Sequence, residues 1–187
     1  FGGIVKLIGY VIKIGLSPNS NYAWGIDDTY IFSIWDLTKE PNKGQVASNL
    51  KGEKLEIEST DVWSVIWSKD DNNSFAFLKK NELNLYKDFK CEEILTCSGY
   101  LAEFSDLSLN TIMLEDLLIK PSVDNKYNVN DISIVFETRT LRDLRVMIES
   151  CNPIEDLFSY VERHNNNKLW QLFIEYAMLK LDFSISE

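Results

Sequence analysis

The chain has 187 residues, of which 45% are hydrophobic and 26% are charged, as in an ordinary globular protein with one sizeable core or two small units. Its net charge of −10 argues against sequence-independent binding to nucleic acid or to an anionic membrane, because both need clustered Lys and Arg. No apolar run reaches the roughly 18 residues of a membrane-spanning helix. We therefore expect no nucleic-acid partner and no direct membrane insertion.

The first strands form one unit. Apolar runs alternate with turn residues, and Tyr22, Trp24 and Ile26 follow the two-residue period of a strand. The stretch 38–59 is polar and suits a loop, with Leu55 and Ile57 forming an outer strand. The expected strands are an edge strand at 4–8 and further strands at 11–16, 22–26 and 30–37.

A second unit repeats this order. Strands are predicted at 62–68, 75–78 and 83–86, separated by the polar turns 69–74 and 79–82. Trp63, Val65 and Trp67 alternate with their neighbours and are expected on one face. The offset between the units is about fifty residues, which is near the period of β-propeller blades. Each such blade is a four-stranded antiparallel sheet that packs on the next one.

Further β-type alternation follows at 91–95, 100–104 and 107–111, with a strand through Leu114. The clearest linker is 120–130, which is rich in Asn and poor in apolar residues, and a last strand is expected at 132–136. We therefore predict blades of a WD40-like antiparallel propeller over residues 1–119 and a linker or joint over 120–138.

The spacing becomes helical from Thr140. Thr140 and Asp143 are placed as a weak capping box for the first helix, while Asn152 is the expected N-cap of the second, with Pro153 at its first position. A third helix is expected at 168–181, with the asparagines after His164 ending one helix and capping the next. Residues 139–187 thus predict the first helices of an α-solenoid similar to tetratricopeptide repeats.

No residue group points to catalysis, a cofactor or a metal. The single histidine, His164, stands at an expected helix end, where interaction with the helix dipole is the simplest role. The acidic pairs at 27–28 and 70–71 fit turn chemistry better than acid–base catalysis. Cys91, Cys97 and Cys151 show no metal spacing and are expected as free thiols in a reducing compartment. The chain begins with Phe1 rather than Met, and we interpret it as a piece of a longer protein.

Several strings follow one another in an order typical of one family: DVWSVIWSKDD at 61–71, CSGYLAEFSDLSLNTIMLEDLL at 97–118, FETRTLRDLRVMIE at 136–149 and KLWQLFIEYAMLKLDF at 168–183. They resemble the WD-repeat subunits of the intraflagellar transport A complex. The resemblance implies two tandem propellers followed by a long helical-repeat tail, an arrangement shared with coatomer subunits. It implies no catalytic residues. A WD-repeat protein of the tubby-like type is a weaker match.

The resemblance implies a non-enzymatic scaffold in the cytoplasm and cilium, including the ciliary base. Its expected partners are other subunits of that complex, and its work is retrograde ciliary transport and ciliary entry of membrane proteins. The segment 136–145 would be the joint between propeller and solenoid. The alternative is a propeller-based hydrolase or lyase whose active site lies outside this chain or at blade-turn carboxylates such as Asp27 and Asp28. The residues expected to serve the joint or protein contacts are Trp63, Trp67, Arg139, Arg142, Arg145 and Trp170.

Overall fold

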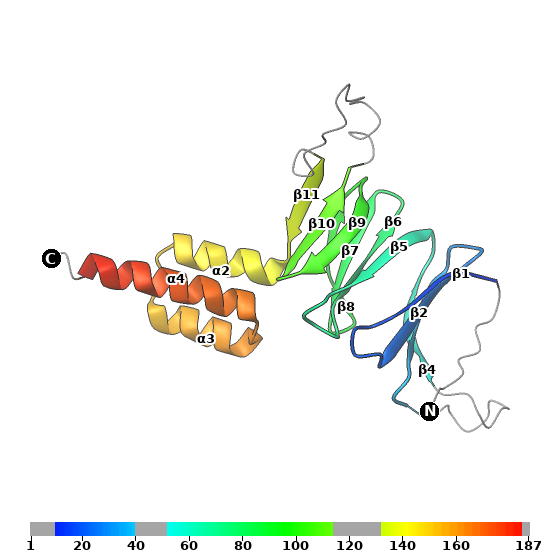
Figure 1. Cartoon of the computed structure of the whole chain (residues 1–187), viewed down its shortest axis with the longest axis horizontal. Coiled ribbons are helices and arrows are strands. Elements are labelled where there is room, and N and C mark those ends of the chain that lie inside the picture. The colour runs from blue at the N-terminus through cyan, green and yellow to red at the C-terminus, as the bar shows by residue number, and fades with distance from the viewer. Residues whose placement is uncertain (1–9, 40–51, 114–131, 185–187) are drawn as a thin grey trace, which may run out of the picture.

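The structure is a computed structural model, and it describes residues 10–39, 52–113 and 132–184, with no side chains beyond residue 180. Within these ranges, three antiparallel sheets stand side by side and three helices extend beyond the third sheet (Figure 1). This architecture confirms the predicted propeller-like blades followed by helices. The expected strand at 4–8, the strand end at Leu114 and the linker at 120–130 lie outside the described residues. The strands are β1 (Val11–Leu16), β2 (Tyr22–Asp27), β3 (Phe32–Asp36), β4 (Glu53–Ser59), β5 (Val62–Trp67), β6 (Phe75–Lys79), β7 (Glu82–Lys87), β8 (Lys90–Thr96), β9 (Tyr100–Ser105), β10 (Ser108–Ile112) and β11 (Ser133–Glu137).

The first sheet has the order β1-β2-β3-β4, and local polar side chains close its turns. Asp27 Oδ1 accepts hydrogen bonds from the backbone N–H and the hydroxyl of Thr29 and from the backbone N–H of Ile31. The hydrogen bond from the Thr29 side chain is the main reason that the pKa of Asp27 lies below its usual value. Asp71 likewise accepts from Asn73 and Ser74. One carboxylate of each acidic pair, Asp27 or Asp71, therefore closes a turn, whereas Asp70 accepts a hydrogen bond from the Asp106 N–H in the β9–β10 turn.

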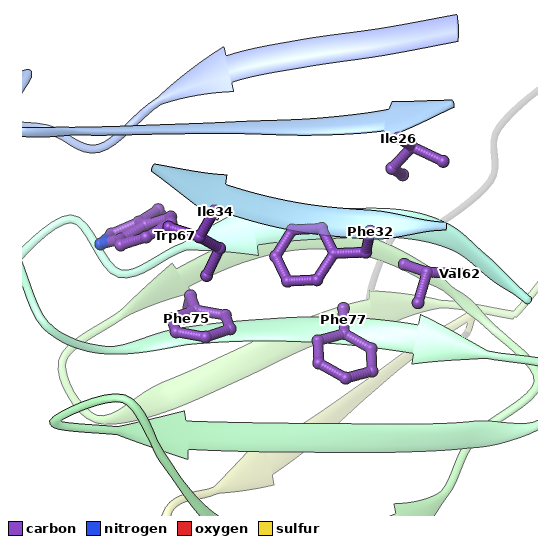
Figure 2. Close-up of a cluster of buried hydrophobic side chains, with 7 residues drawn as sticks. All are labelled: Ile26, Phe32, Ile34, Val62, Trp67, Phe75 and Phe77. Carbon is purple, nitrogen blue, oxygen red and sulfur yellow. The ribbon is translucent and has the colours of Figure 1, made fainter. Parts of the chain in front are cut away.

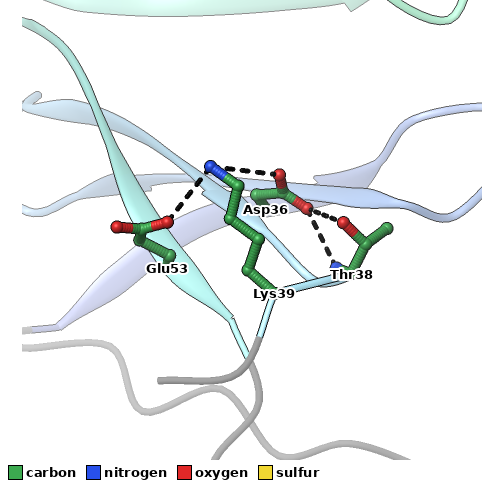
Figure 3. Close-up of polar contacts among 4 residues, drawn as sticks. All are labelled: Asp36, Thr38, Lys39 and Glu53. Carbon is green, nitrogen blue, oxygen red and sulfur yellow. Dashed lines mark hydrogen bonds and ion pairs between the residues drawn. The ribbon is translucent and has the colours of Figure 1, made fainter. Parts of the chain in front are cut away.

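The end of β3 is tied to β4 by a small polar cluster (Figure 3). Asp36 Oδ1 accepts from the backbone N–H and the hydroxyl of Thr38, at 2.9 and 2.6 Å. Lys39 Nζ lies 3.1 Å from Glu53 Oε2 and 3.9 Å from Asp36 Oδ2. These contacts hold the fourth strand against the third, and β4 is the outer strand that Leu55 and Ile57 predicted.

The second sheet has the order β5-β6-β7-β8, and its inner strands β6 and β7 are buried on both faces. In β6, Phe75 and Phe77 point to the first sheet, while Ala76 and Leu78 point to the third. Figure 2 shows the first of these two cores, where side chains from both sheets interdigitate. Its buried members are Ile26, Phe32, Ile34, Val62, Trp67, Phe75 and Phe77.

A β-bulge separates the two tryptophans of β5. The pairing of β5 with β6 shifts register between Val62 and Ser64, and such a bulge turns one residue out of the alternation. As a result Trp67 packs into the core with the first sheet, whereas Trp63 packs into the core with the third. The expectation that Trp63 and Trp67 share a face is wrong.

The third sheet has the order β11-β10-β9 in the described residues. Strand β11 pairs with β10 from Ser108↔Glu137 to Ile112↔Ser133. The C-terminal end of the predicted joint at 120–138 is therefore a strand of the third sheet. The helices follow at once, as α2 (Arg139–Glu149), α3 (Ile154–His164) and α4 (Asn167–Ser184). Their own core is Leu141, Leu144, Leu157, Val161 and Leu169, and Leu107 of the β9–β10 turn packs against it.

The structure corrects two predicted helix starts. Helix α2 has Thr138 rather than Thr140 as its N-cap, because Thr138 keeps an extended backbone and its N–H bonds to Leu107 O. Helix α3 has Pro153 rather than Asn152 as its N-cap, because the Asn152 N–H bonds back to Met147 O and still belongs to the end of α2.

The third helix start follows its prediction. Asn166 Oδ1 accepts from the Lys168 N–H, as expected of an N-cap, and Asn165 ends α3 in the left-handed conformation.

Candidate functional site at the joint

The joint lies where α2 and α3 meet the strands β7, β8 and β11. Its main-chain link is short, since the Thr138 N–H donates to Leu107 O at 2.9 Å and the Thr138 carbonyl then accepts from the N–H groups of Leu141 and Arg142. The last strand of the sheet therefore runs into the first helix without an intervening loop (Figure 1). Because only Thr138 separates β11 from α2, the position of β11 in the sheet sets the direction in which α2 leaves it.

Two arginines of α2 form ion pairs with carboxylates on the sheets. Arg142 Nη2 lies 2.6 Å from both carboxylate oxygens of Glu93 on β8. Arg145 Nη2 lies 3.1 Å from Glu137 Oε1 on β11. Each arginine side chain is less than half exposed, and each carboxylate is more buried than its partner. The helix is thus held to two different sheets by charge-assisted contacts.

The third arginine, Arg139, acts at longer range. The pKa of Glu92 is raised mainly by burial, and the charges of Lys87, Arg139 and Arg142 oppose that increase. Arg139 is the first residue of α2, and its charge therefore favours the ionised form of a half-buried carboxylate on β8.

A second set of contacts centres on Lys87 at the end of β7. Its ammonium donates to the hydroxyl of Thr140 at 3.1 Å and lies 3.5 Å from Nδ1 of His164. The hydroxyl of Tyr160 on α3 donates to the Thr140 carbonyl at 3.0 Å, and its ring lies 4.5 Å from that of His164. These four residues join one strand to two helices.

A small cavity lies beside these contacts. It is lined by residues of the second sheet, the third sheet and the start of α2, and it has room for about one water molecule. Thr138, which lines it, is 5% exposed, and its Oγ1 is a buried side-chain polar atom without a hydrogen-bond partner in the described part of the chain.

The predicted aromatic residues lie in three different places. Trp67 Nε1 donates to Asn72 O at 2.8 Å, and its ring stacks on Phe75 between the first and second sheets. Trp63 Nε1 donates to Lys80 O, and its ring meets Tyr100 edge-on on the third sheet. We expected both to anchor the propeller to the helices, but the structure places them between sheets.

Trp170 belongs to the helices, where its ring contacts Phe158 and Phe173 edge-on. The joint residues that sequence reasoning missed are Lys87, Glu92, Glu93 and Tyr160. Their strands and helix were predicted, but no local pattern shows which exposed charges on β7 and β8 will face a helix 50 residues later.

Two other kinds of site are absent from the described part of the chain. Among the described residues, no three or more His, Cys, Asp or Glu side chains come together as a metal site. None of the helices within the described ranges is long and apolar enough to cross a membrane.

WD repeat-containing protein 35 from Homo sapiens is 32% identical over 175 residues, which is 94% of this chain and 14% of that protein. The proteins of the same name from Rattus norvegicus and Mus musculus are also 32% identical, over 91% of the chain and 14% of their own length. The chain thus spans about one seventh of these relatives. The crystal structure of Kluyvelomyces marxianus Hsv2 aligns with a TM-score of 0.37 at 11% identity, covering 70% of this chain and 36% of that one.

The family comparison is more specific. Residues 7–133 match the family described as the WDR35 second beta-propeller, and this range contains every described strand up to the start of β11. The chain therefore belongs to the WDR35 second beta-propeller family, with the joint and its helices following the matched region.

Proposed function

We propose that this chain is a non-enzymatic scaffold part of the intraflagellar transport A complex, with other subunits of that complex as its partners. Its place of work is the cytoplasm and the cilium, including the ciliary base. Its task is to support retrograde ciliary transport and the entry of membrane proteins into cilia. The family membership and the resemblance of the motifs at 61–71, 97–118, 136–149 and 168–183 support this proposal.

The mechanism is mechanical. A scaffold of this kind has to hold a helical arm at a fixed direction to the propeller. The observation that carries the proposal is the pair between Arg142 and Glu93, because one guanidinium reaches from α2 to both carboxylate oxygens on β8. Both contacts come from one nitrogen, Nη2, which lies between the two carboxylate oxygens, and a charge-assisted pair of this length is stronger than a neutral hydrogen bond. The pair between Arg145 and Glu137 adds a second point of attachment.

The test is a pull-down of the tagged protein from ciliated cells. We expect other transport-complex subunits in the eluate of the unmodified protein. Arg142→Glu should reduce their recovery, because it places two negative charges together at the joint. The exchanged pair Arg142→Glu with Glu93→Arg should restore recovery. Lys90→Glu is the matched control, since Lys90 is an exposed cation on β8, the strand that carries Glu93. It makes the same charge change and should leave recovery unchanged.

Two results contradict the proposal. If no transport-complex subunit accompanies the unmodified protein, the assignment to that complex is wrong. If Arg142→Glu leaves both recovery and thermal stability unchanged, the joint does not fix the arm.

A further inference from the structure

The single histidine of the chain sits at the joint. His164 is the last residue of α3, and its ring is half-buried against the end of β7. Its Nδ1 lies 3.5 Å from the Lys87 ammonium, which also donates to Thr140 on α2. The Tyr160 ring covers the imidazole at 4.5 Å between ring centres. The His164 side chain thus forms a contact between α3 and the second sheet.

We propose that neutral His164 latches the helices to the second sheet through Lys87, and that protonation of His164 opens this latch, so that the joint responds to pH. This inference rests on the joint geometry alone and goes beyond the scaffold role, which would stand without it.

The chemistry of the contact depends on the charge of the imidazole. A neutral imidazole protonated at Nε2 has a lone pair at Nδ1, which can accept a hydrogen bond from an ammonium group. An imidazolium has N–H donors at both nitrogens and no acceptor. Protonation would therefore replace an attractive contact by two cations facing each other at the same distance.

The surrounding groups decide when this happens. Burial lowers the pKa of His164 first, and the charges of Lys87 on β7 and Arg163 on α3 lower it further, whereas Asp143 on α2 raises it. Glu92 on β8 also faces the cluster, and its charge acts on Tyr160. Because most of these effects disfavour the cation, His164 is neutral at pH 7.

The direction of the pH effect follows from linkage. Between the ordinary histidine pKa of 6.5 and the lower value in the folded chain, the unfolded state binds a proton that the folded state does not. Stability is therefore lost as the pH falls below 6.5, and the latch opens only when the folded state itself takes up the proton.

The natural cysteines allow a direct measurement. Cys91 on β8 and Cys151 between α2 and α3 are exposed on opposite sides of the joint, while Cys97 is buried. Nitroxide labels on Cys91 and Cys151 report the joint by pulsed electron paramagnetic resonance. We expect a narrow distance distribution at pH 7.5 that broadens reversibly as the pH is lowered through the His164 titration. The same titration appears in a histidine-labelled NMR spectrum, which has one imidazole signal.

Three variants make the test specific. His164→Gln should keep its distribution narrow over the same pH range. Lys87→Gln should raise the pKa of His164 and remove the broadening, because the opposing cation is gone. Lys90→Gln is the control, and it should behave like the unmodified chain.

The inference is overturned if the NMR signal titrates without a change in the distance distribution. It is also overturned if His164→Gln broadens as much as the unmodified chain, or if Lys87→Gln leaves both the titration and the broadening as they were.

Discussion

Replacing Phe77 by alanine should cost about 3–5 kcal/mol of unfolding free energy. Phe77 is 1% exposed and lies between the first two sheets. The centre of its ring lies 5.3 Å from the ring centre of Phe32 and 5.4 Å from that of Tyr86. A buried aromatic side chain removes about 150–250 Å² from water, and about 25 cal/mol per Å² gives roughly 4–6 kcal/mol for the whole ring. The alanine side chain still buries part of this area, and a fully extended reference chain overstates the area that folding removes from water. The expected loss is therefore smaller than the value for the whole ring.

Such a loss is a large share of the total free energy of unfolding, which is about 5–15 kcal/mol for a typical domain. The assay is urea unfolding followed by tryptophan fluorescence, with Trp67 in the same core cluster as reporter. With a slope of about 1–3 kcal/mol per molar urea, the midpoint should fall by about 1 M or more at unchanged slope.

The matched control is Phe158→Ala on α3. Its side chain is 42% exposed, so the expected loss is below about 2 kcal/mol. The reasoning about sheet packing is refuted if Phe77→Ala costs less than about 1 kcal/mol, or if it costs no more than Phe158→Ala.

Three further changes test local features. Gly15→Ala should destabilise the chain by about 1–3 kcal/mol in the same urea assay, because a Cβ at Gly15 would lie 2.5 Å from the Trp24 ring on the paired strand; equal stability would show that the indole moves aside freely. Thr138→Val should leave the melting temperature unchanged or raise it, because the lost hydroxyl has no partner in the described residues, and a clear fall would reveal one. Asp27→Asn should be less stable at pH 7, with a difference that shrinks as the pH falls below 3.8 through the lowered pKa of Asp27, since that carboxylate stabilises the fold only while ionised; a difference that persists at pH 2 would argue against a role of the charge.

The repeat pattern predicted most of the fold. Alternating aromatic and β-branched residues located the strands of the first two sheets, because each such strand buries at least one face. The change to helical spacing after residue 139 separated sheets from helices. These features are local and periodic, so the sequence predicts them without any knowledge of tertiary contacts.

Features that depend on tertiary contacts were harder. The bulge at Trp63 depends on how β5 meets β6, and strict alternation cannot reveal it. The start of α2 depends on the bond from Thr138 to Leu107, a residue 31 positions earlier. The sequence predicts Arg139, Arg142 and Arg145 as joint residues, but it does not single out Lys87, Glu92 or Glu93, because charged residues on a strand look like any solvated side chains.

The direct passage from β11 into α2 has a geometric consequence. The 18 residues of α4 extend about 27 Å at 1.5 Å per residue, which makes the helices a lever with its pivot at residue 138. A tilt of about 10° at that pivot would move the far end of such a lever by roughly 5 Å, close to one helical turn. Angular precision at a handful of joint atoms therefore decides positional accuracy far away, and a substitution at the pivot can act at a distance without touching anything there.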